Sequence, residues 1–143
     1  MRGLSQAALL APAILLLLSC SSLATAPIDG TYALESIGGA ALPTSIGGQA
    51  LIIVSQVVDL KSRGIAQTTE VFRVVTDGSG GPPQTTVLDG SWERDGNTVV
   101  VTTSRDRTKY VIEDHGRTLR SVERTFFGAS LDVLYEYVLT RRR

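Results

Sequence analysis

The sequence predicts an all-β fold, an eight-stranded antiparallel up-and-down β-barrel, after an N-terminal signal peptide. Beyond residue 30, no stretch shows the 3.6-residue apolar period of an amphipathic helix. Period-two stretches alternate there with glycine-containing turns. Eight such stretches fit one domain in a chain of 143 residues. Eight strands can also close a sheet on itself, which removes its exposed edges.

Residues 1–19 have the pattern of a signal peptide. Arg2 and the terminal amine form a small positive region, and Ala7 to Leu18 form an apolar run. A helix needs roughly 20 apolar residues to cross a bilayer, so this shorter run predicts a signal peptide rather than a membrane span. Cys20, the only cysteine of the chain, comes two residues after the run.

The segment Leu17-Leu18-Ser19-Cys20 resembles the lipobox of bacterial lipoproteins. The resemblance implies that a diacylglycerol is attached to Cys20, that the chain is cleaved before it, and that the protein is held at a membrane. Two or three acyl chains anchor stably, at about 0.8 kcal/mol per buried CH₂. Ser21 resembles the residue that follows the cysteine in lipoproteins of the outer membrane, which predicts an envelope location facing the periplasm. The competing interpretation is secretion after cleavage at Ala24-Thr25-Ala26.

The rest of the chain divides into a flexible tether over 20–29, which is small and polar, and a barrel domain over 30–143. The strands are expected at 31–37, 50–60, 65–76, 84–93, 97–104, 108–114, 118–127 and 131–141. Tight glycine-containing turns are expected at 61–64, 94–97 and 114–117, and the other connections are longer or looser. Connections of an up-and-down sheet alternate between its two ends. The barrel is therefore expected to have short turns at one end and long loops at the other.

Several motifs resemble bacterial lipocalin-like lipoproteins over nearly the whole chain after Cys20. They are Gly30-Thr31-Tyr32-Ala33-Leu34, Ala41-Leu42-Pro43, Gly90-Ser91-Trp92 before Asp95-Gly96-Asn97-Thr98-Val99, and Tyr135 to Arg141. The resemblance implies a lipocalin-like barrel. Lipocalins place Gly-x-Trp in the first strand and an arginine near the C-terminus packed over that tryptophan. Here the first-strand aromatic is Tyr32, and Arg141 is the candidate partner.

Strand alternation predicts the residues that line the interior. The expected lining residues are Tyr32, Leu34, Leu88, Trp92, Tyr110, Ile112, Tyr135 and Tyr137. An eight-stranded barrel is either filled by its side chains or holds one small ligand, and the sequence leaves both open. Leu51-Ile52-Ile53-Val54 is apolar on both faces, which indicates either a covered outer surface or an exposed apolar strip.

No pattern predicts an enzyme, a cofactor or a metal site. His115, the only histidine, lies in an expected tight turn and has no partner ligand nearby in the sequence. The glycine-rich segment 77–83 lacks the Gly-Lys-Ser/Thr ending of a phosphate-binding loop. Glu70, Glu113 and Glu123 are expected at outward or ambiguous strand positions. With 14 basic and 14 acidic residues, the chain is not expected to bind nucleic acid.

Two functions remain open at this stage. The first is a carrier, attached to the membrane through lipidated Cys20, that holds a small hydrophobic ligand. The second is a non-enzymatic structural or interaction lipoprotein, whose filled barrel displays its loops or the apolar strand at 50–60 to an envelope protein partner. The basic residues of 105–109 and 141–143 are expected to be solvated, with contact to anionic lipid headgroups as the alternative.

Overall fold

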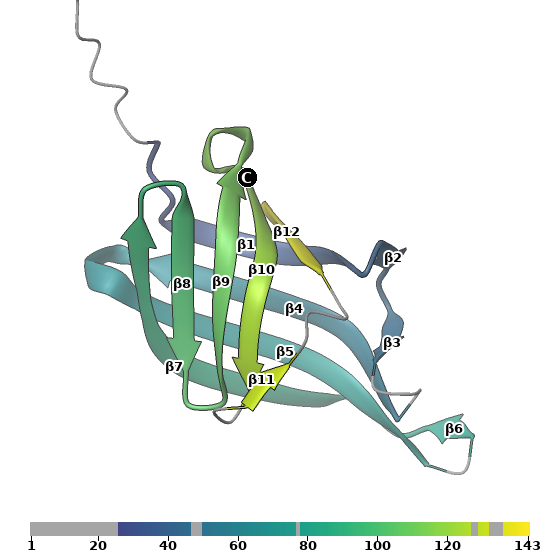
Figure 1. Cartoon of the computed structure of the whole chain (residues 1–143). Coiled ribbons are helices and arrows are strands. Elements are labelled where there is room, and N and C mark those ends of the chain that lie inside the picture. The colour runs from purple at the N-terminus through teal and green to yellow at the C-terminus, as the bar shows by residue number, and fades with distance from the viewer. Residues whose placement is uncertain (1–25, 47–49, 77, 127–128, 132–135) are drawn as a thin grey trace, which may run out of the picture.

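The computed structural model describes residues 26–46, 50–76, 78–126, 129–131 and 136–143. They form a closed eight-stranded antiparallel β-barrel (Figure 1), which confirms the predicted fold class. The strands are β1 (Gly30–Ile37), β4 (Leu51–Lys61), β5 (Ile65–Thr76), β7 (Gln84–Asp95), β8 (Thr98–Thr103), β9 (Asp106–Glu113), β10 (Thr118–Phe126) and β12 (Tyr137–Arg141). Each strand pairs with the next in this order, and β12 pairs with β1 to close the barrel.

Shorter elements lie in the connections. They are β2 (Ala40–Ala41), β3 (Thr44–Ile46), β6 (Ser79–Gly80) and β11 (Ala129–Leu131), with single 3₁₀ turns η1 (Ser62–Gly64) and η2 (Asp114–Gly116). Among the described residues there is no helix with the length and apolar character that a membrane crossing requires.

The two ends of the barrel differ as expected except at the β8–β9 connection, which was expected to be looser but has only Ser104 and Arg105 between the strands. One end, called the turn end here, carries η1, the β7–β8 turn and η2, together with the start of β1 and the end of β12. The opposite end, called the loop end, carries the connections that contain β2 and β3, β6 and β11. In Figure 1 the β7–β8 and β9–β10 turns lie at the top and the β8–β9 connection lies at the bottom.

Three β-bulges determine which side chains face the interior. The register shifts between Leu34 and Ser36 in β1, between Ile53 and Ser55 in β4, and between Ser121 and Glu123 in β10. Each bulge adds one residue to its strand, so the inward set changes parity there. The buried or half-buried positions follow this change: Leu34 then Ile37, Ile53 then Gln56, and Ser121 then Arg124.

The turn end is closed by residues 26–29, which pack across it. Arg94 Nη1 donates to the carbonyl of Ala26 at 2.6 Å, and Arg141 donates to the carbonyls of Pro27 and Asp29. The hydroxyl of Tyr32 lies 2.9 Å from the Ile28 carbonyl and 2.8 Å from that of Gly116. The Ile28 side chain is buried. Residues 26–29, expected to belong to the flexible tether, are therefore part of the folded domain.

Gly30 and Gly90 lie where another chain segment approaches closely. A Cβ at Gly30 would lie 2.7 Å from Arg141 Nε, so the Arg141 side chain lies over Gly30. At Gly90, β7 changes partners: residues 84–91 pair with β5 and residues 90–95 pair with β8. A Cβ at Gly90 would lie 2.0 Å from the carbonyl oxygen of Thr102, a backbone atom.

The last predicted strand, 131–141, is described only at its two ends, because residues 132–135 lie outside the described residues. Strand β11 pairs with the end of β10, with Arg124 opposite Leu131, while β12 pairs with its start, with Arg120 opposite Val138. Between these two paired positions, β10 advances by four residues (124 − 120), whereas the chain from β11 to β12 advances by seven (138 − 131). Apolar alternation records the side on which a residue lies and not its partner, so it contains no signal for this offset.

We expect Gly90→Ala to destabilise the barrel, because the new methyl group would collide with the backbone of β8. The free energy of unfolding should fall by about 2 kcal/mol or more, as for other overpacked sites. Urea denaturation followed by circular dichroism measures the change. Ser91→Ala, at the exposed neighbouring position, is the matched control and should have little effect. Equal stability of the two variants would contradict the close approach at Gly90.

Candidate functional site

A group of polar side chains occupies the loop-end half of the barrel interior. We call it the inner polar cluster. It consists of Gln56 on β4, Glu70 on β5, Arg105 and Asp106 at the β8–β9 connection, Tyr110 on β9, Arg124 on β10 and Tyr137 on β12. Its members come from β4, β5, β9, β10 and β12 and from the β8–β9 connection.

Regular alternation and the bulges bring these side chains inward. On β5, Glu70 follows Ala66 and Thr68 at inward positions, and all three are buried. Gln56 lies directly opposite Glu70 in the β4–β5 ladder. It faces inward because the β4 bulge shifts the alternation that begins at Ile53. Arg124 faces inward because the β10 bulge makes Val122 the extra residue.

Two ion pairs hold the cluster together. Arg105 Nη1 lies 3.1 Å from Glu70 Oε1, and these side chains are 19% and 5% exposed. Arg124 donates from Nη2 at 2.5 Å and from Nε at 3.0 Å to the same oxygen, Asp106 Oδ2. Transfer of such pairs out of water costs desolvation energy that the mutual attraction often only offsets. Stability alone therefore gives a weak reason for this arrangement.

Two tyrosines complete the cluster. The guanidinium carbon of Arg124 lies 4.6 Å from the centre of the Tyr137 ring, within cation–π distance. The Tyr137 backbone N–H donates to Ser121 Oγ at 2.8 Å, which ties β12 to β10. Burial raises the pKa of Tyr110 and of Tyr137, and the positive charge of Arg124 only partly opposes it. Both phenols therefore remain protonated and able to donate hydrogen bonds at neutral pH.

Gln56 is the member whose polar atom lacks a partner. The residue is 3% exposed, and its Oε1 has no hydrogen-bond partner among the described residues. A buried polar atom left unpaired costs about 1–3 kcal/mol, and such atoms are rare in folded proteins. An amide left unpaired at this place therefore contributes little to stability or reduces it.

The expected lining residues fall into three groups. Tyr110 and Tyr137 belong to the inner polar cluster. Tyr32, Leu34 and Ile112 are buried, Tyr32 through its contacts at the turn end. Leu88 and Trp92 are half-buried, and Trp92 Nε1 donates to the carbonyl of Lys61 at 2.7 Å beside η1. Tyr135 lies outside the described residues.

The structure corrects two expectations about charged residues. Glu70 faces the interior, although it was expected at an outward or ambiguous position. Arg105 was expected to be solvated, but its side chain is only 19% exposed and forms an ion pair with Glu70. The neighbouring Asp106 forms the second ion pair of the cluster, with Arg124. The sequence signal available for Glu70 was its parity with Ala66 and Thr68. No signal was available for Arg124, since a bulge separates it from the alternation of its strand.

The apolar strand at 51–54 is partly covered. Ile53 faces the interior, and Leu51, Ile52 and Val54 are half-buried. Strand β3 pairs with residues 51–53, and a Cβ at Gly80 of β6 would lie 3.9 Å from Ile52 Cδ1. The interpretation in which a loop covers this outer surface is therefore favoured over an exposed apolar strip.

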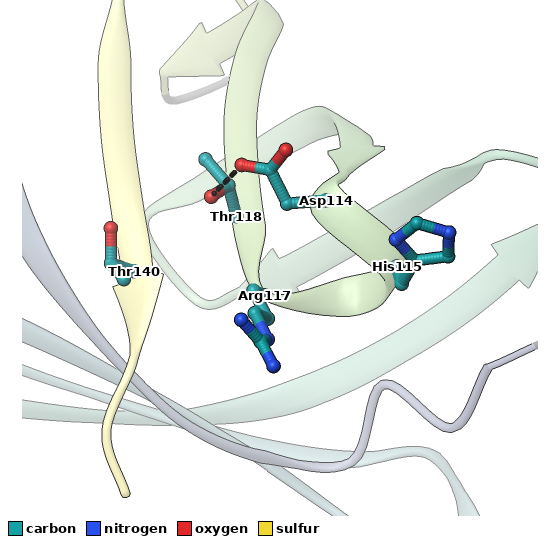
Figure 2. A pocket seen from close by; sticks show the side chains of 5 residues that line it. All are labelled: Asp114, His115, Arg117, Thr118 and Thr140. Carbon is teal, nitrogen blue, oxygen red and sulfur yellow. Dashed lines mark hydrogen bonds between the residues drawn. The ribbon is translucent and has the colours of Figure 1, made fainter.

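The turn end has an open polar hollow of about 480 Å³ on its outer surface. It is lined by Asp114, His115, Arg117, Thr118 and Thr140. Figure 2 shows the Asp114 carboxylate accepting a hydrogen bond from the Thr118 hydroxyl at 3.0 Å, with the His115 ring pointing away from both. His115 is exposed in the η2 turn, as expected. Within the described part of the chain, no three His, Cys, Asp or Glu side chains are grouped to hold a metal ion.

We expect removal of one partner of a buried pair to cost more than removal of both. Arg124→Met leaves the Asp106 carboxylate buried without its cation, which should lower the free energy of unfolding by about 3 kcal/mol. The double variant Arg124→Met with Asp106→Leu should recover most of this loss. Urea denaturation of the wild-type protein, both single variants and the double variant measures the coupling.

The outer pair of Arg107 and Glu123 is the matched control. Its atoms lie 4.0 Å apart and its side chains are 52% and 55% exposed. Arg107→Met should change stability by no more than about 0.5 kcal/mol. If Arg124→Met were equally mild, or if the double variant were less stable than either single one, the inner pair would not be the compensated buried pair described above.

Comparisons of the chain with protein-family models, with curated proteins and with solved structures found no match. The interpretation of the inner polar cluster therefore depends on its own residues. Arginines, carboxylates, an amide and phenols are groups that bind other molecules through hydrogen bonds and charge.

Proposed function

We propose that the chain is a lipid-anchored lipoprotein of a bacterial envelope, with a lipocalin-like barrel that binds a small apolar or amphipathic ligand at its loop end. The observation that supports binding there is a mixed surface. Four half-buried apolar side chains pack against the core at this end: Leu42, Ile46, Leu51 and Phe72. Phe72 occupies the next inward position after Glu70 on β5, so this apolar group borders the inner polar cluster.

The ligand site is shallower than the cup expected from the sequence. Tyr32, Leu60, Val99, Leu119 and Leu139 fill the turn-end half of the barrel, and all are fully buried. A ligand that reached this depth would have to displace several of them, each at a cost of about 1.5–3 kcal/mol of lost burial. At the loop end, the apolar side chains of this group are only half-buried, so contact with a ligand there costs less burial.

The anchor and the fold together suggest an orientation. Residues 26–29 are fixed on the turn end, and six steps of chain separate Cys20 from Ala26 (26 − 20). Fully extended, those steps span about 20 Å. If Cys20 carries the lipid, the turn end therefore faces the bilayer and the loop end faces away from it.

The alternative function is an interaction lipoprotein with a filled barrel that displays its loops to an envelope protein. The packed turn-end half favours it, because a scaffold needs no internal cavity whereas a carrier does. The two functions differ at the loop end, where only the carrier requires a saturable site for small molecules.

For the anchor, we expect Cys20→Ala to abolish leader processing and to move the protein out of the membrane fraction, while Ser21→Ala leaves both unchanged.

Single cysteines introduced as His115→Cys at the turn end and Ser79→Cys at the loop end then test the orientation. A fluorophore at position 115 should be quenched strongly by spin-labelled lipid, and one at position 79 weakly. Membrane association that survives Cys20→Ala would refute the anchor, and equal quenching would refute the orientation.

For the ligand site, we expect N-phenyl-1-naphthylamine, an uncharged fluorescent dye, to bind saturably at the loop end. Phe72→Ser removes an aromatic face from the site and should weaken binding about tenfold, which corresponds to 1.4 kcal/mol of lost apolar contact. Val87→Ser, at an exposed apolar position on the outside of β7, is the matched control and should leave the affinity unchanged. The carrier function is wrong if the dye does not bind, or if the two variants weaken binding equally.

A further inference from the structure

The inner polar cluster has charges that compensate one another. Glu70 is paired with Arg105 and Asp106 with Arg124, so these four groups sum to zero. A ligand that brought a net charge to this place would add an uncompensated charge to a largely buried site, which is costly. A neutral ligand would avoid that cost.

The group that lacks a partner in the cluster is itself neutral. Gln56 is buried with its Oε1 unpaired, opposite Glu70 in the β4–β5 ladder. Rotation of the terminal amide by 180° exchanges its oxygen with its NH₂ group, so Gln56 can accept or donate a hydrogen bond. Its natural partner is a group that does both, and hydroxyl and amide groups have this property.

The neighbouring arginines provide the access. The side chain of Arg124 is 16% exposed and that of Asp106 10%, and Arg105 is likewise more exposed than Glu70. In both pairs the arginine side chain is the more exposed partner, and Arg105 comes from the β8–β9 connection at the loop end. A polar group that enters from the loop end meets N–H donors first and Gln56 behind them, while Phe72 and Leu51 border its path with apolar surface.

We infer that the ligand of the loop end is a neutral amphiphile, whose hydroxyl or amide head group binds Gln56 and the guanidinium groups of Arg105 and Arg124, and whose apolar part lies against Phe72. This inference depends on the proposed carrier function and specifies its ligand class. Carboxylate and ammonium amphiphiles bind less well, because the charges of the cluster are already paired.

The experiment compares three photoreactive probes that share one diazirine-bearing acyl or alkyl chain: a glycerol monoester, a fatty acid and an alkylamine. The purified full chain is reconstituted in phosphatidylcholine vesicles, each probe is activated by light, and labelled peptides are located by mass spectrometry. We expect the monoester to label the loop end saturably and at least about tenfold more strongly than the other two probes. An excess of free glycerol tests whether the site recognises the head group alone, because glycerol would then compete fully with the monoester.

Gln56→Leu is the decisive variant. It removes the unpaired buried amide, so the protein should become more stable or stay equally stable while monoester labelling falls about tenfold, the factor that corresponds to 1.4 kcal/mol. Gln67→Leu is the matched control, because Gln67 lies on the neighbouring strand with its amide bonded to Asp89 at 2.7 Å on the outside of the barrel. Its labelling should match that of the wild-type protein.

The outcomes separate this inference from the carrier function. Equal labelling by the three probes, preference for a charged probe, full competition by glycerol, or labelling unaffected by Gln56→Leu would overturn the inference while dye binding at Phe72 still supported a carrier. If a buried water is the only partner of Gln56, Gln56→Leu should change stability while the monoester labels neither the wild-type protein nor any variant. That result also overturns the inference. Absence of both dye binding and probe labelling would refute the carrier itself.

Discussion

A strand in a closed barrel has to bend, and in this chain three strands bend by inserting one residue near the loop end. The consequence is chemical as well as geometric. Without the extra residue in β10, Glu123 would face the interior and Arg124 the solvent, and Arg124 could not pair with Asp106. Without the extra residue in β4, Gln56 would lie on the outer face. The inner polar cluster therefore exists because of these bulges.

The two halves of the interior have different roles. In the turn-end half, Tyr32 and its apolar neighbours are fully buried, and residues 26–29 are fixed over the turn end by four hydrogen-bonded carbonyls. This half contributes apolar burial that stabilises the barrel. In the other half, two ion pairs and an unpaired amide lie among buried apolar side chains such as Ile37 and Ile53. These polar groups contribute little to stability or reduce it. Local departures from good packing of this kind are expected where a protein binds something.

The sequence was sufficient for the architecture but not for the cluster. Alternation and glycine turns locate the eight strands and both barrel ends, because each depends on residues close in the chain. Tyr110 and Tyr137 were placed inside for the same reason. Gln56 and Arg124 were not, since a bulge leaves no local signature and a polar residue after it continues the apparent outward pattern. Glu70 had the correct parity, but its buried position depends on Arg105, which is distant in sequence.

The most direct test of this account is the register of β9 and β10 in solution. Cross-strand nuclear Overhauser effects in the purified protein report which residues face each other. We expect Glu123 opposite Lys109 and Arg124 opposite Thr108, with Val122 as the extra residue and the Arg124 side chain against the Tyr137 ring. An unbroken ladder with Val122 opposite Lys109 and Glu123 opposite Thr108 would place Arg124 outside the barrel and contradict the account.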